Sequence, residues 1–178
     1  GLLSPIIKSL NNSKKIKTYL IVSGSHLDDK FGKTINEINK DKIKIFKKIK
    51  LKNSNLKHKD SLDYTPKNIS EIISKYSLCL KKIRPDYNLV YADRFETFGA
   101  TIASTQMNIP TIHVEGGDKT EGGTLDDSVR HAMTKLSHIH ITTNQNAKER
   151  IINLGEEKWR VKNFGYSCLL YTSPSPRD

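Results

Sequence analysis

The chain has 178 residues, of which 35% are hydrophobic, and a formal net charge of +11. Its length suits a single domain with a core of its own, and it has no apolar run of about 18 residues, which argues against a membrane-spanning helix. Basic charge can indicate nucleic-acid binding, but residues 1–84 hold 20 Lys and Arg against 7 Asp and Glu, whereas residues 85–178 hold 10 against 12. We therefore expect a solvated, lysine-rich surface in the first half, with no nucleic-acid or membrane partner.

Hydrophobic spacing predicts four elements in the basic half: an amphipathic helix (1–11), a buried strand (17–23), a weak helix (27–40) and a strand with one solvated face (43–51). After a polar loop, Thr65 and Pro66 are typical of the N-cap and first position of a helix, and Pro85 ends its apolar stripe. Cys79 lies on that stripe and is expected in the core. Neither it nor Cys168 has the spacing of a metal site or a disulfide framework, which fits a reducing cytoplasm.

The second half alternates strands and helices. Strands are predicted at 88–92, 109–114, 138–143 and 161–164, and helices at 95–107, from about 125, and at 144–154 with Gly155 as its end. This alternation favours an α/β fold in which helices cover both faces of a parallel sheet. Trp159 is expected to pack near the last strand.

Three acidic residues lie at the ends of predicted strands or open the helix beside them. Asp93 and Glu115 end consecutive strands, and Asp126 lies in the first turn of the helix after the second. Ligands bind at the carboxyl ends of the strands in such sheets, and carboxylates confined together separate in pKa, so that one can act as a base and another as an acid. Structural roles also fit: a turn at Glu115, and favourable charge or capping at the helix start, where Thr124 and Asp127 match a capping box.

The remaining candidates are glycines, an arginine and histidines: Gly116, Gly117, Gly122, Gly123, Arg130, His131 and His138. The glycines permit a close backbone approach or a positive φ. Arg130 could reach a phosphate or pair with Asp126 or Asp127. The two histidines suit structural roles better than ligand contacts, although His131 stays a candidate contact.

The chain resembles the hydrolysing UDP-N-acetylglucosamine 2-epimerases, especially their sialic-acid-type branch. The matching residues are His113 to Gly117, Asp126 to Ala132 and Thr134 to His138, with further similarity from Pro85 to Asp93 and on to about Gly165. This resemblance implies a Rossmann-like domain, residues 1–167, that is the N-terminal half of a GT-B type two-domain fold. On the same ground we expect the first strand of that fold to be missing and residues 168–178 to be a non-native tail.

The resemblance also implies a reaction. The family removes the proton at C2 of the sugar, expels UDP from C1 to give a glycal, and adds water to yield N-acetylmannosamine for sialic-acid-type sugars. The likeness suggests catalytic roles for Asp93, Glu115 and Asp126, and substrate contacts at Gly116, Gly117, Arg130, His131 and His26. An exposed loop position also fits His26. No cofactor or metal is implied; the substrate is UDP-N-acetylglucosamine or a related UDP-amino sugar, and the full-length protein is expected to be a cytoplasmic homodimer.

Two other functions fit the sequence. One is a non-catalytic module that binds nucleotide sugars or polyanions through the basic half, with binding that weakens steeply as salt rises. The other is a glycosyltransferase domain on the same scaffold, which the match of the acids to the epimerases disfavours. Because the epimerases take most of their nucleotide contacts from a second domain, we expect the 178-residue chain alone to be inactive.

Overall fold

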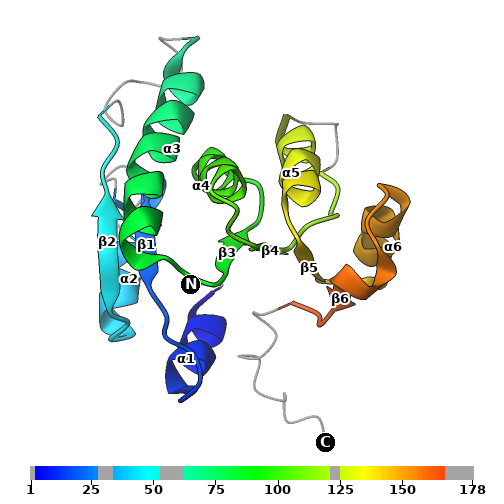
Figure 1. Ribbon diagram of the computed structural model, residues 1–178, viewed down its shortest axis with the longest axis horizontal. Helices are drawn as coiled ribbons and strands as arrows, with labels where there is room; N and C mark the ends of the chain where they lie inside the picture. Colours follow the sequence, from blue (N-terminus) through cyan, green and yellow to red (C-terminus); the bar gives the residue numbers. More distant parts are fainter. Residues whose placement is uncertain (1–2, 28–33, 53–61, 121–124, 167–178) are drawn as a thin grey trace, which may run out of the picture. The chain divides into compact units, whose positions relative to one another are not determined.

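A computed structural model describes residues 3–27, 34–52, 62–120 and 125–166 of the chain (Figure 1). The chain divides into two compact units, Gly1–Lys50 with Gly165–Asp178, and Leu51–Phe164. Three loop residues discussed above and the expected tail lie outside the described residues: Gly122, Gly123, Thr124 and 168–178. Within the described ranges, no helix is both long and apolar enough to cross a membrane.

The first unit contains a two-stranded parallel sheet. Its elements are helix α1 (Ser4–Asn12), strand β1 (Leu20–Ser23), the 3-10 helix η1 (Gly24–Leu27), helix α2 (Ile35–Lys40) and strand β2 (Ile45–Ile49). Asp41 ties α1 to the end of α2, since its carboxylate accepts hydrogen bonds from Ser4 Oγ (2.6 Å) and Lys8 Nζ (2.7 Å). The first predicted helix and both strands are confirmed, whereas the helix predicted from residue 27 begins only at Ile35.

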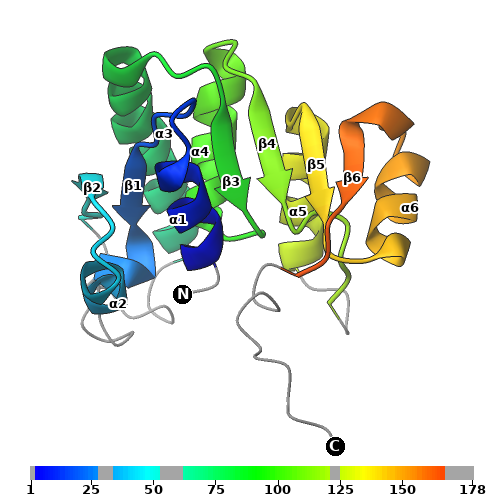
Figure 2. The same ribbon diagram turned by 90° about the horizontal axis from the view of Figure 1, so that it is seen from below.

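The second unit contains a four-stranded parallel sheet with its helices. The elements are α3 (Tyr64–Ile83), β3 (Asn88–Tyr91), α4 (Phe95–Gln106), β4 (Thr111–Val114), α5 (Leu125–Leu136), β5 (Ile139–Thr142), α6 (Gln145–Asn153), the 3-10 helix η3 (Lys158–Arg160) and β6 (Val161–Asn163). The strands lie side by side in the order β3-β4-β5-β6 (Figure 2). Because each right-handed crossover steps in the same direction, α4, α5 and α6 cover one face of this sheet. The predicted α/β class with parallel strands is confirmed.

Apolar side chains from helices and strands form the core of the second unit. Met133 of α5 is completely buried and packs with Val90 of β3. A polar chain crosses the same layer, since Tyr76 Oη donates to Asn88 Oδ1 (2.6 Å) and Asn88 Nδ2 donates to Ser104 Oγ (2.7 Å). Burial raises the pKa of Tyr76, so its hydroxyl stays a donor. These contacts fix β3 and thereby the residues that follow it.

Two local predictions about this unit are wrong. Helix α3 begins at Tyr64, one residue before Thr65, which was the predicted N-cap. Buried Tyr64 packs against Phe95 with ring centroids 6.4 Å apart, so a tertiary contact extends the helix past its local start signal. Trp159 is 61% exposed and does not pack into the core.

Candidate active site

The sheet edge at which β3 and β4 end holds two of the predicted acids. Ala92 N donates to Val114 O (2.9 Å), which extends the pairing of the two strands by one residue. Glu115 N in turn donates to Ile141 O of β5 (2.9 Å). Asp93 and Glu115 therefore leave neighbouring strands at one edge, where parallel strands lie about 5 Å apart. The two consecutive strands are thus also adjacent in the sheet.

Both strands end in a left-handed backbone conformation. Ala92 has φ +57° and Glu115 has φ +63°, a region that costs a residue with a side chain about 1–2 kcal/mol. His113, which is fully buried, supports the first of these turns because its Nε2 donates to Ala92 O (2.9 Å). Burial lowers the pKa of His113 to about 4, so the ring is neutral at pH 7. Backbone strain beside the acids is typical of functional sites.

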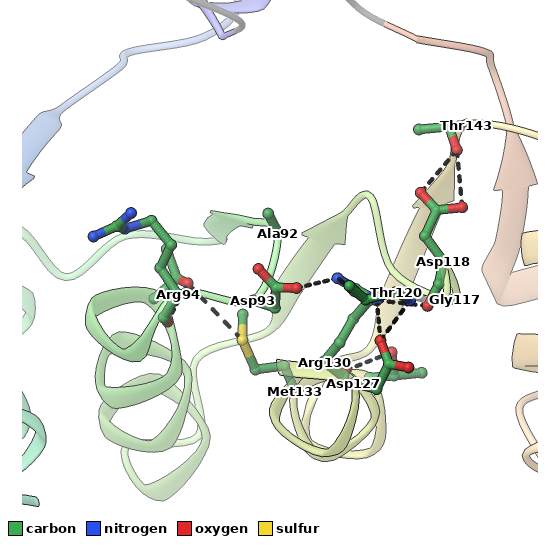
Figure 3. A network of polar contacts seen from close by, with 12 residues as sticks. Ala92, Asp93, Arg94, Gly117, Asp118, Thr120, Asp127, Arg130, Met133 and Thr143 are labelled. Atoms are coloured by element: carbon green, nitrogen blue, oxygen red, sulfur yellow. Dashed lines mark hydrogen bonds and ion pairs between the residues drawn. The ribbon is translucent and has the colours of Figure 1, made fainter. Parts of the chain in front are cut away.

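Arg130 of α5 is the centre of the polar network at this edge (Figure 3). Its Nη2 pairs with Asp93 Oδ2, and its Nη1 pairs with Asp127 Oδ1 (2.8 Å). Nη1 also donates to the carbonyl oxygen of Asp118 (2.6 Å), and Nη2 donates to Thr120 Oγ1 (3.4 Å). The Arg130 side chain is only 10% exposed. The guanidinium thus joins the end of β3 to α5 and to the loop after β4.

Asp118 extends this network to the next strand. Its carboxylate accepts hydrogen bonds from Thr143 Oγ1 (3.1 Å) and Asn144 Nδ2 (3.1 Å), which follow β5. Asn144 also caps α6, because its Oδ1 accepts a hydrogen bond from Ala147 N (2.8 Å). Side chains therefore join three consecutive strand ends.

The negative charge at this edge acts on Glu115, which is half-buried. Burial raises the pKa of the Glu115 carboxyl, and the charges of Asp118 and Asp93 raise it further. A hydrogen bond from Tyr91 and the charge of Arg130 oppose this rise without cancelling it. Glu115 therefore holds its proton more readily than an ordinary glutamate.

The two aspartates that open α5 lie in different surroundings. Asp127 accepts a hydrogen bond from Thr120 N (2.9 Å), and this bond, followed by a hydrogen bond with the Thr120 side chain and the charge of Arg130, lowers the pKa of the carboxyl. Asp126 is exposed, and no donor in the described part of the chain bonds to it. Arg130 accordingly pairs with Asp127 and with Asp93. Asp126, the residue before Asp127, does not take part in this network. The capping box expected at Asp127 needs Thr124, which lies outside the described residues.

The two glycines that follow the end of β4 are packed against protein atoms. A Cβ at Gly116 would lie 2.9 Å from His113 Nδ1. A Cβ at Gly117, which has φ +82°, would lie 2.5 Å from Ala147 O. Arg150 of α6 also donates a hydrogen bond to Gly117 O. Close approach within the protein therefore accounts for both glycines.

The candidate histidines lie in different places. His131 on α5 is half-buried, and its Nδ1 is buried without a partner among the residues described. His138 Nδ1 accepts a hydrogen bond from Thr111 N (3.2 Å) at the opposite end of β4, which is the structural role predicted. His26 belongs to the first unit, where its Nδ1 bonds to Thr34 Oγ1 (2.6 Å).

Sequence reasoning missed four residues of the network: Asp118, Thr120, Thr143 and Asn144. Thr143 directly follows β5, so the rule that sites form at strand ends applies to it as much as to Asp93. Asp118 follows Gly117 in a loop already considered for its glycines. In the described ranges, no group of His, Cys, Asp and Glu residues has an arrangement that could hold a metal ion.

Comparison with known proteins gives consistent matches. The family model for UDP-N-acetylglucosamine 2-epimerase matches residues 8–169. A UDP-N,N'-diacetylbacillosamine 2-epimerase (hydrolyzing) of Legionella pneumophila is 34% identical over 93% of this chain and 42% of its own length. The GDP/UDP-N,N'-diacetylbacillosamine 2-epimerase (hydrolyzing) of Campylobacter jejuni is 35% identical over 92% of this chain and 41% of its own length. The UDP-N-acetylglucosamine 2-epimerase of Neisseria meningitidis is 29% identical over 93% of this chain and 41% of its own length.

Solved structures share the fold. The UDP-GlcNAc 2-epimerase of Neisseria meningitidis bound to UDP-GlcNAc has a TM-score of 0.79 at 21% identity, over 93% of this chain and 43% of that one. The Methanocaldococcus jannaschii enzyme in complex with UDP-GlcNAc and UDP has a TM-score of 0.77 at 17% identity, over 95% and 45%. These likenesses confirm the predicted Rossmann-like fold. The chain spans about two fifths of the length of the relatives it matches.

Proposed function

Since the chain belongs to the UDP-N-acetylglucosamine 2-epimerase family, we propose that the protein containing it is a hydrolysing UDP-sugar 2-epimerase. In this proposal the chain supplies the part of the enzyme that carries the catalytic acids. One observation carries it: Asp93 and Glu115 leave adjacent parallel strands at one edge, close enough for the charge of one to raise the pKa of the other.

The reaction needs both an acid and a base beside one sugar ring. A base removes the C2 proton while the C1–O bond breaks and UDP leaves, which gives a glycal; water then adds a proton to C2 and hydroxyl to C1. Glu115 is the proposed acid, because its raised pKa keeps a proton available nearer to neutral pH. Asp93, oriented by its ion pair, is the proposed base. Asp126, exposed in the first turn of α5, is the third carboxylate with a proposed catalytic role.

The proposed substrate is a UDP-linked 2-acetamido sugar. The Neisseria meningitidis relative is named for UDP-N-acetylglucosamine, and the Legionella pneumophila relative for its diacetylated counterpart. The proposed product is accordingly N-acetylmannosamine or its diacetamido analogue, for a sialic-acid-type sugar. Proposed substrate contacts are His131, His26 and the backbone at Gly116 and Gly117. A cytoplasmic homodimer is the proposed form of the full-length protein.

The test is UDP release by the full-length protein from UDP-N-acetylglucosamine and from the diacetamido sugar. Asp93→Asn, Glu115→Gln and Asp126→Asn are each expected to lower kcat by about 10²-fold or more, because each removes a proton-transfer group. Circular dichroism checks that the variants keep the wild-type fold. Glu149→Gln, an exposed acid on α6, is the matched control and is expected to keep wild-type activity. Folded Asp93 and Glu115 variants with undiminished turnover would refute the assignment of these acids.

A further inference from the structure

Arg130 has the donors of a phosphate-binding residue, but protein acceptors already occupy those of its two terminal nitrogens. A guanidinium carries five N–H groups, and four of these are on the terminal nitrogens. Nη1 donates to Asp118 O (2.6 Å) and Asp127 Oδ1 (2.8 Å), while Nη2 donates to Asp93 Oδ2 and Thr120 Oγ1 (3.4 Å). Each terminal N–H is therefore matched by a protein acceptor, which leaves none of them for a phosphate oxygen.

We propose that Arg130 is a positioning residue, which holds the Asp93 carboxylate and the loop after β4 in their working places and does not bind the diphosphate of the substrate. This inference rests on the proposed function. It separates two roles that the sequence leaves open for Arg130, contact with a phosphate and pairing with an acid.

Asp93 is held at two points, and Arg130 is one of them. Its backbone follows the left-handed turn at Ala92 (φ +57°), which the buried His113 supports through its Nε2 hydrogen bond (2.9 Å). Its side chain is fixed by the Arg130 guanidinium. A base that must reach one C–H bond gains from such double support, because a displacement of about 1 Å can cost about 10²-fold in rate.

The same guanidinium also fixes the loop that carries Asp118 and Thr120. Asp118 is anchored at its carboxylate by Thr143 Oγ1 (3.1 Å) and Asn144 Nδ2 (3.1 Å), and at its carbonyl by Arg130 (2.6 Å). Asp118 is also one of the charges that raise the pKa of Glu115. Arg130 thus sets the surroundings of both proposed proton-transfer groups, although it lies on a different element from either.

The planar fork of arginine is needed for this role, because a lysine ammonium cannot serve Asp93 and Asp127 from two nitrogens at once. We expect Arg130→Lys in the full-length protein to lower kcat by about 10²-fold, with the KM for the UDP-sugar and the inhibition constant for UDP each within about threefold of wild type. Arg130→Ala is expected to lower kcat further, and added guanidinium ions are expected to restore part of it. The lysine variant retains a cation between two carboxylates and is expected to fold.

Arg150→Lys is the matched control. Arg150 also donates to the loop after β4, at Gly117 O, but it makes no bond to Asp93. Its kcat is expected to stay within about threefold of wild type, since the orientation of the base does not depend on it. An equal loss of kcat in the two lysine variants would contradict the positioning role, because loop support alone would then explain the effect.

The outcomes distinguish this inference from the proposed function. A wild-type protein that releases no UDP would contradict the proposed function itself. An active protein in which Arg130→Lys raises KM and the UDP inhibition constant by tenfold or more, with kcat kept, would show that Arg130 binds the diphosphate. A crystal structure of the unsubstituted protein with UDP tests the same point without any variant: Arg130 is expected to stay on Asp93 and Asp127, and a phosphate oxygen within hydrogen-bond distance of it would overturn the proposal.

Discussion

Two buried histidines lie side by side on neighbouring strands, and both are neutral in the folded chain at pH 7. His113 of β4 pairs in register with His140 of β5, and neither side chain is exposed. Burial is the main cause that lowers the pKa of each, to about 4 for His113. An unfolded chain would protonate both near the ordinary histidine value of 6.5.

The sign of the resulting pH dependence follows from proton uptake. Between pH 6.5 and about 4 the unfolded state binds a proton at His113 that the folded state does not, so stability falls as pH falls through this window. Through His113 the free energy of unfolding falls by about 3 kcal/mol in total once the pH is below the pKa of His113 in the folded chain. We expect His113→Gln, which can still donate from Nε2 to Ala92 O but cannot titrate, to lose less stability on acidification.

Urea unfolding at pH 7 and pH 4.5 measures this effect. The comparison is the change in unfolding free energy between the two pH values, so a lower stability of the variant at pH 7 does not enter. His140 and the carboxylates are present in both proteins, so their contributions to the change in unfolding free energy cancel in this comparison. Equal losses in wild type and His113→Gln would show that His113 does not carry the pH dependence.

At the scale of elements, Gly117 is the point at which the loop after β4 meets α6. It has φ +82°, and an added Cβ would lie 2.5 Å from Ala147 O and 2.8 Å from Ile151 Cγ1. Gly117→Ala is expected to cost about 2–5 kcal/mol, because a left-handed alanine costs about 1–2 and overpacking against a helix backbone about 1–3. Thermal or urea unfolding measures this loss.

Gly155→Ala separates the two contributions. Gly155 has φ +95°, but the nearest atom to its Cβ would be Lys135 Nζ at 3.9 Å, an ordinary contact. We expect this control to lose only about 1–2 kcal/mol, the conformational part of the cost. If both alanine variants lost equal stability, the close approach of Gly117 to α6 would contribute nothing.

The strands and helices of the second unit could be predicted because their hydrophobic patterns are local. The four residue pairs that join β3 to β4 in register, and the acids after these strands, follow from strand periodicity and the rule for parallel sheets. The Arg130 network could not be predicted in the same way. It depends on the φ of Ala92 and Glu115, and on which of two adjacent aspartates turns inward on α5. A sequence pattern places both aspartates in one helical turn and does not choose between them.

At the scale of the molecule, we expect the charge at the strand-end edge to hinder the binding of a UDP-sugar by the 178-residue chain alone. The edge of the second unit carries acidic residues from the strand ends and α5: Asp93, Glu115, Asp118, Asp126 and Asp127. Arg130, the cation of this network, is already committed to two of them. These carboxylates repel the negatively charged diphosphate of a UDP-sugar, and exposed Lys119 in the loop after β4 offsets only part of their charge. The chain also spans only about two fifths of the length of its relatives.

We therefore expect the isolated 178-residue chain to release no UDP under conditions in which the full-length protein turns over. The missing contribution is cationic contact with the diphosphate, which the network at this edge does not offer. A coupled assay for UDP, run on equal molar amounts of both proteins, measures the difference, and circular dichroism of the isolated chain checks that it is folded. UDP release by the chain alone would show that the acids and their support suffice for both binding and chemistry. Repulsion by the carboxylates would then not prevent binding, and the lysine-rich first half or Arg130 itself would have to hold the leaving group.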